Sequence, residues 1–239
     1  MLSEHPRAAV GRSQTALAIG GSEVAWEGGS LRVSFAERTA VAGRHLEGEV
    51  WLHPSATFDA PVAIDGRGRH FWWGVAPHSR AEVELRRPRA LRFSGHAYHD
   101  ANFGAEPLEA GFRRWSWSRA RLDDRTVVIY DSERRDGSRG VLTRSFAADG
   151  ALAGVDLPQP VDLGRTRWGI DRATRCDAGG RARVVRALED TPFYARSEIV
   201  TDVAGASVAA VHESLDLDRF ARPIVQHMLT YRIRREGQP

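Results

Sequence analysis

The residues best suited to chemistry gather between Gly68 and Arg121. This quarter of the chain holds four of the seven tryptophans and four of the nine histidines. His70 and Trp72 are two residues apart, as are Tyr98 and Asp100, and side chains at that spacing lie on one face of a β-strand, about 6.5 Å apart. An acid, a phenol, an imidazole and several indoles can therefore face one cavity.

A purely structural interpretation of the same residues stays open. In it the indoles, which include the pair Trp115 and Trp117, fill the core of a β-sheet. Asp100, close to Asn102 and Gly104, then only shapes a turn. Sequence pattern alone does not decide between a cavity and a core.

Strands are the elements that would position these side chains. Residues 31–35, 47–52 and 80–86 alternate polar with apolar side chains, as half-buried strands do. Further strands are expected at 126–130, 140–146, 181–188, 193–201, 208–217 and 224–234, and a short turn of helix at 218–221. Many short strands separated by turns predict an all-β, antiparallel sandwich or barrel.

Composition narrows the function classes. The 239 residues carry a net charge of +3, every basic residue is arginine, and these arginines are scattered among acidic residues, which argues against a nucleic-acid binder. One cysteine, Cys176, excludes an internal disulfide and a multi-cysteine zinc site. No apolar run is long enough for a signal peptide or a spanning helix, so we expect a cytoplasmic protein, at most peripheral to the inner membrane.

Two other motifs suggest chemistry but fit poorly. His96 and His99 look like a metal pair, yet on a strand they point to opposite faces, so we predict no metal. Asp100 with Glu106 or Glu109 resembles the carboxylate pair of a glycosidase, but acidic residues this close are common. His212 and Glu213 are interpreted as a pair at the rim of the core.

Six segments together resemble one enzyme family, the carotenoid 1,2-hydratases or hydroxyneurosporene synthases. They occur in the expected order across nearly the whole chain, and include HFWWGVAP and GHAYHDAN. Their ranges are 70–77, 80–85, 95–102, 111–119, 192–196 and 211–220.

The resemblance implies two consecutive lipocalin-like β domains, and the segment from Met1 to Arg12 looks like the middle of the first. We therefore expect an incomplete first domain at 1–157, which carries the site, and a second β region at 158–239. The opening strands of the first domain would be missing.

The resemblance also implies an activity, the addition of water to the terminal C1=C2 double bond of an acyclic carotenoid, without a cofactor. Asp100 would protonate the alkene, assisted by Tyr98, His70 and Trp72. The substrate would be held by Trp73, Trp115, Trp117 and Asn102.

Physical chemistry supports these roles. A carboxyl group in an apolar cavity has a raised pKa, so it can keep its proton near neutral pH and act as a general acid. Indole faces stabilise a carbocation by about 0.5–2 kcal/mol each. Two alternatives use the same cavity without hydration, namely a carrier of hydrophobic ligands and a cyclase or isomerase of polyene natural products.

Overall fold

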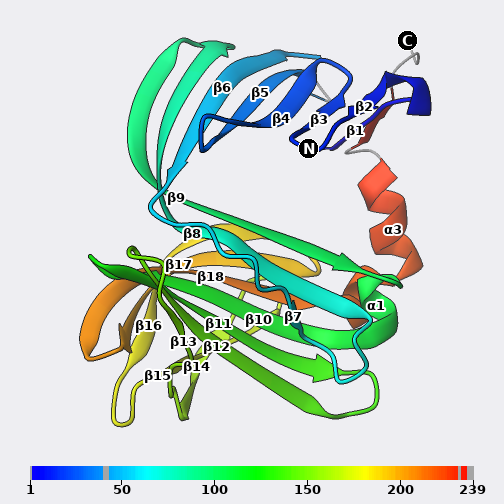
Figure 1. The fold of residues 1–239 in the computed structure, drawn as a ribbon. Coiled ribbons are helices and arrows are strands. Elements are labelled where there is room, and N and C mark those ends of the chain that lie inside the picture. Colours follow the sequence, from blue (N-terminus) through cyan, green and yellow to red (C-terminus); the bar gives the residue numbers. More distant parts are fainter. Residues whose placement is uncertain (1, 40–42, 231–232, 236–239) are drawn as a thin grey trace. The chain divides into compact units, whose positions relative to one another are not determined.

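The computed structural model describes residues 2–39, 43–230 and 233–235, and the chain divides into two compact units. The first unit comprises residues 1–55, 79–98 and 226–239, and the second comprises 56–78 and 99–225. Within both units nearly all strand pairs are antiparallel, which confirms the predicted all-β class. Figure 1 shows the elements of each unit.

The first unit is built on a sheet whose strands follow the order β2-β3-β4-β5-β6-β8. A separate parallel pair joins β1 to β19, and a short 3-10 helix, η1, follows β1. The bounds are β1 Leu2–Glu4, η1 Arg7–Ala9, β2 Val10–Arg12, β3 Ala16–Ile19, β4 Ser22–Glu27, β5 Ser30–Arg38, β6 His45–Pro54 and β19 Ile233–Arg235.

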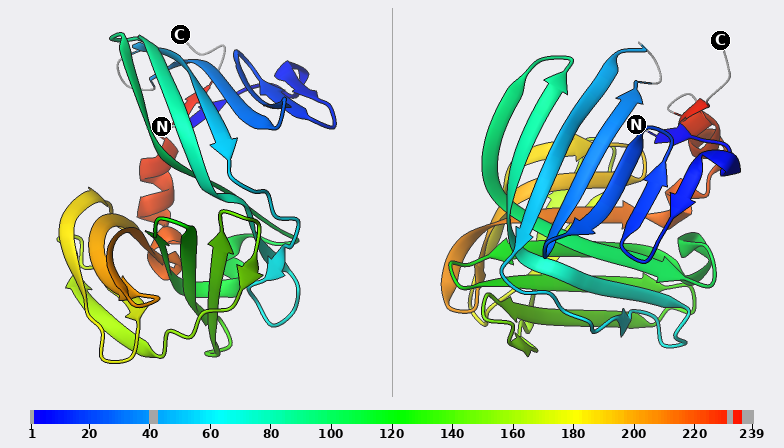
Figure 2. Two further views of the ribbon diagram at one scale, coloured as in Figure 1. Left: turned by 60° about the vertical axis from the view of Figure 1, so that its left-hand side comes forward. Right: turned by 45° about the horizontal axis from the view of Figure 1, so that its top comes forward.

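The second unit contains a seven-stranded sheet in the order β13-β12-β11-β10-β18-β17-β16. The sheet twists and curves, as the two views of Figure 2 show. Its strands are β10 Phe112–Arg121, β11 Arg125–Arg134, β12 Arg139–Ala147, β13 Leu152–Ala153, β16 Ala182–Asp190, β17 Tyr194–Val203 and β18 Ala206–Asp216. The predicted hairpin turn joins β11 to β12 and contains Gly137 at φ 83°.

One face of this sheet forms an aliphatic core. The hairpin of β14 (Gln159–Arg165) and β15 (Asp171–Cys176) belongs to the same unit. Leu157 and Leu163 pack with residues of the sheet that are 0–4% exposed, which are Ala120, Val127, Ile129, Ile199, Val203 and Ala210. The side chains that alternate with these point to the opposite face, where the candidate site lies.

Two long strands contribute to both units. β8 (His70–Arg87) belongs to the second unit up to His78, and β9 (Leu91–Gly104) enters it at His99. In the second unit β8 also pairs with β7 (Val62–Ala63). Two short helices, α1 (Leu108–Gly111) and α2 (Leu217–Phe220), complete this unit, and α2 confirms the predicted turn of helix.

The strand predicted at 224–234 is wrong for its first part. Pro223–Thr230 form a helix, α3, residues 231–232 lie outside the described residues, and β19 follows. Proline suits the first position of a helix because its missing N–H has no partner there. Val225 and Leu229 are apolar at i and i+4, a spacing that fits one helix face as well as an alternating strand.

The predicted domain boundary between residues 157 and 158 does not coincide with the two units. Strands β10–β13 precede it and β16–β18 follow it, yet they belong to one hydrogen-bonded sheet. The boundary therefore falls inside the second unit. Turn-rich sequence at Pro158 and Pro160 suggested a linker, but β14 begins there at Gln159.

Candidate active site

The start of β8 places His70 and Trp72 on one face, as the two-residue spacing predicted. His70 is 2% exposed and Trp72 is 1% exposed. The His70 ring packs against Phe112, with ring centroids 5.0 Å apart, and the Trp72 ring packs against Tyr130 at 6.0 Å. This face of β8 therefore lies on the seven-stranded sheet.

Aromatic rings form a continuous cluster between β8 and that sheet. Trp115 contacts both Phe112 and Tyr130 edge-on, each with ring centroids 5.8 Å apart. Phe146 packs edge-on against Trp72 at 5.9 Å and against Phe58 at 4.9 Å. We call the residues Phe58, His70, Trp72, Phe112, Trp115, Tyr130 and Phe146 the aromatic cluster.

Asp100 lies at the edge of the aromatic cluster, where a hydrogen bond fixes one of its oxygens. The indole Nε1 of Trp72 donates to Oδ2 of Asp100 over 2.7 Å. The Asp100 side chain is half-buried. Because an indole N–H only donates, this bond uses Oδ2 as an acceptor. Sequence reasoning paired the two residues but assigned Trp72 only the role of a cation-stabilising ring.

Tyr130 is a site residue that sequence reasoning missed. Its hydroxyl donates to Oδ1 of Asn102 over 3.3 Å, and its side chain is 5% exposed. Burial, followed by the negative charges of Asp100 and Glu213, raises the pKa of Tyr130 far above its ordinary value. The phenol therefore stays protonated and remains a hydrogen-bond donor beside the acid.

His99, the residue before Asp100, brings no positive charge to the site at neutral pH. Burial lowers the pKa of His99, although the charge of Asp100 opposes this effect. A neutral imidazole does not form an ion pair that would hold Asp100 as a carboxylate.

His70 hydrogen-bonds to a different carboxylate from the predicted one. Its Nε2 lies 3.2 Å from Oε1 of Glu106, and Arg69 pairs with the other oxygen of Glu106 at 2.9 Å. Glycine is required at position 111, because a Cβ there would lie 2.6 Å from Nε2 of His70. Sequence reasoning considered Glu106 only as part of a glycosidase pair.

A tight turn before β8 holds His70 in place through Asp65. The carboxylate of Asp65 accepts the backbone N–H groups of Arg69 at 3.0 Å and of His70 at 3.2 Å. Burial alone would raise the pKa of Asp65, but these N–H groups and the nearby His70 ring outweigh it and lower the pKa.

Replacing Asp65 by alanine is expected to reduce the free energy of unfolding by about 1–3 kcal/mol at neutral pH, because two backbone N–H groups lose their acceptor. A lowered folded-state pKa stabilises the protein above the unfolded-state pKa, and this contribution disappears as pH falls through the folded-state value. Urea unfolding of both proteins from pH 7 down to the acid range measures the difference. A gap that stays constant or widens in acid would contradict this role.

The other predicted residues occupy varied positions. Trp117 is 9% exposed and opposes Tyr130 across the sheet, whereas half-buried Trp73 donates from Nε1 to the carbonyl of Phe58 at 2.6 Å. Tyr98 is half-buried and belongs to the first unit. Its part in the chemistry stays a prediction. The same holds for substrate binding by Trp73, Trp115, Trp117 and Asn102.

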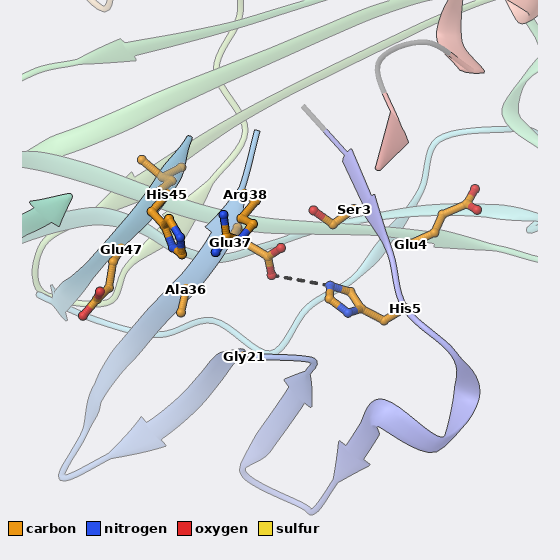
Figure 3. A pocket seen from close by; sticks show the side chains of 10 residues that line it. Ser3, Glu4, His5, Gly21, Ala36, Glu37, Arg38, His45 and Glu47 are labelled. Carbon is orange, nitrogen blue, oxygen red and sulfur yellow. Dashed lines mark ion pairs between the residues drawn. The ribbon is translucent and has the colours of Figure 1, made fainter. Parts of the chain in front are cut away.

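A separate cavity of about 360 Å³ lies in the first unit (Figure 3). His5 pairs with Glu37 there, with 3.6 Å between Nε2 and Oε1, and Ser22 donates to the same oxygen at 2.7 Å. His45 and Glu47 also line it. Apart from the two imidazoles, its lining residues carry no aromatic ring, and charged groups dominate its walls, so the cavity does not suit a polyene.

Comparison with known proteins assigns the chain to a family. The family model described as carotenoid hydratase CrtC matches residues 1–238. The chain belongs to this family. The carotenoid-hydratase resemblance inferred from the six segments is thereby confirmed.

Two curated relatives share the name acyclic carotenoid 1,2-hydratase. The protein of Thiocapsa roseopersicina is 44% identical over 237 residues, which cover 99% of this chain and 58% of the relative. That of Cereibacter sphaeroides is 38% identical, with 99% of this chain and 85% of the relative covered. The chain thus spans well under two thirds of the length of the Thiocapsa protein.

A solved structure supports the fold of this carotenoid hydratase family member. The crystal structure of an AttH-type protein from Nitrosomonas europaea superimposes with a TM-score of 0.64 over 87% of this chain and 71% of that chain, at 14% identity. The lipocalin-like β architecture is confirmed. Within the described residues, no helix has the length and apolar character needed to cross a membrane.

Proposed function

We propose that this chain hydrates the terminal C1=C2 double bond of an acyclic carotenoid, with Asp100 as the acid. The observation that carries the proposal is the 2.7 Å hydrogen bond from buried Trp72 to Oδ2 of Asp100. It supports the proposal because it joins the Asp100 carboxyl group to a ring of the aromatic cluster in a member of the carotenoid hydratase family. The names of the curated relatives support the same substrate class.

The first step is proton transfer to C2. The π electrons of the double bond take the proton from Oδ1 of Asp100, the O–H bond breaks, and a tertiary cation forms at C1. The Trp72 N–H stabilises the carboxylate that remains, because a hydrogen bond to a charged acceptor is stronger than one to a neutral acceptor. No metal or nucleotide takes part in this step.

The cation then requires an environment that tolerates positive charge. The aromatic cluster offers indole and phenol faces, and each well-placed face stabilises a cation by about 0.5–2 kcal/mol. A water molecule next adds its oxygen lone pair to C1, and loss of one of its protons gives the tertiary alcohol. His70 and Tyr98 are proposed to orient the acid and the substrate around it.

Purified protein incubated with detergent-solubilised neurosporene or lycopene tests the proposal. A more polar product whose mass exceeds that of the substrate by one water is the expected result. Binding of the carotenoid without conversion, seen as quenching of tryptophan fluorescence, would favour a carrier instead. An isomer of unchanged mass would favour a cyclase or isomerase.

A further inference from the structure

One row of residues crosses the seven-stranded sheet on the face of the aromatic cluster. Arg196 on β17 opposes Glu213 on β18, Glu213 opposes Trp117 on β10, and Trp117 opposes Tyr130 on β11. Directly opposed residues point to the same face of a sheet. Since neighbouring strands lie about 4.8 Å apart, the backbones at Glu213 and Tyr130 are roughly 10 Å apart.

Glu213 is held firmly within this row. Its Oε1 accepts hydrogen bonds from Nε of Arg196 at 2.9 Å and from Nη2 at 2.5 Å, and its side chain is 21% exposed. Tyr194, two residues before Arg196 on β17, contacts the same pair, and burial together with the charge of Glu213 raises the pKa of its phenol. A positioned carboxylate therefore lies among aromatic side chains, and His212 beside it is fully buried on the other face.

Tyr130 lies within the electrostatic influence of both carboxylates. Besides burial, the charges of Asp100 and of Glu213 each raise the pKa of the Tyr130 phenol. Asp100 is hydrogen-bonded to Trp72, and the Trp72 ring packs against Tyr130. Glu213 lies two strands away from Tyr130 on the same face of the sheet. Asp100 and Glu213 therefore come from different strands and both lie near the aromatic cluster.

We propose that Glu213 is the second catalytic carboxylate of the hydration, the group that accepts the proton released by the adding water. This assignment rests on the proposed function. Glu213 lies on the aromatic face but comes from a different strand than Asp100, so it can approach the C1 cation while Asp100 faces C2. Its negative charge also stabilises that cation in a partly desolvated site.

The proton balance is complete with these two groups. Asp100 loses a proton to C2, water forms the C–O bond at C1, and the resulting oxonium ion loses a proton to Glu213. An oxonium ion is a far stronger acid than a carboxylic acid, so a carboxylate that is paired with Arg196 is still basic enough. Exchange with bulk water then removes the proton from Glu213 and returns one to Asp100.

Chemical rescue separates the two steps. The Glu213→Gln variant is expected to hydrate neurosporene about 10²-fold more slowly, the effect of removing a general base. The shorter Glu213→Ala side chain should lose the same activity, and added formate, a small carboxylate that can accept the proton in place of Glu213, should restore part of the rate. Glu198→Gln is the matched control, because Glu198 also pairs with an arginine on a neighbouring strand, Arg186 at 3.0 Å, and should behave like the wild type.

The outcomes distinguish this assignment from the proposed function. Unchanged hydration by Glu213→Gln, or a folded but slow Glu213→Ala protein whose rate formate does not raise, overturns the role of Glu213 only. Absence of hydration in the wild type refutes the proposed function and the assignment with it. If Glu213→Gln does not fold, Glu213→Asp is measured in its place, and a wild-type rate of hydration in that variant overturns the assignment.

Discussion

Replacement of Asp100 by asparagine is expected to lower the rate of carotenoid hydration by about 10²–10⁴-fold, the usual contribution of a general acid. The amide has nearly the same shape as the carboxyl group, and its oxygen can still accept the 2.7 Å hydrogen bond from Trp72. Thermal unfolding should therefore change little. Product formation measured by chromatography and mass spectrometry gives the rate.

Two further measurements make the Asp100 experiment decisive. Asp123→Asn, an exposed position in the turn between β10 and β11, should retain full activity. Added formate should not restore hydration to Asp100→Asn, whereas it should restore part of the rate to Glu213→Ala. A folded Asp100→Asn protein that keeps substantial turnover would show that the acid is another residue.

Replacement of Trp72 by phenylalanine is expected to reduce the rate of hydration by about 10–100-fold, because a hydrogen bond to a charged group contributes about 1.5–3 kcal/mol. Phenylalanine keeps a ring against Tyr130 and Phe146 but has no N–H for Asp100. Trp168→Phe, at a tryptophan that is 53% exposed, is the control and should be unaffected.

The same variant distinguishes chemistry from packing. If Trp72 serves mainly as a core residue, Trp72→Phe should lower the unfolding midpoint while activity per folded molecule stays constant. If the N–H positions the acid, activity per folded molecule should fall even where the protein is fully folded. Steady-state rates and urea unfolding on one preparation provide both values.

Alternation along the chain predicted most of the strands, because a half-buried sheet imposes its two-residue repeat on the sequence. Residues 31–35 and 47–52 lie within β5 and β6. The same rule failed at residues 224–230, where apolar side chains fit an alternating strand and a helix equally well. The position of Pro223 was the available signal for a helix.

The positions of the candidate site residues could be predicted only in part, for a related physical reason. His70 and Trp72 share a face because that property is local to one strand. Tyr130 was missed because its contact with Trp72 joins segments 58 residues apart, and nothing in the apolar run of β11 marks it as a site residue. Glu213 was likewise hidden, since its place beside Trp117 depends on the register of β10 with β18.

The bond between Trp72 and Asp100 also has a stereochemical consequence. A carboxyl group tethered through one oxygen presents the other from a single direction, so the two faces of a planar alkene carbon are not equivalent to it. Hydration in heavy water by the wild type would then create one configuration at C2. A loosened acid would give a mixture of the two C2 enantiomers, and this ratio records how firmly the indole holds its partner.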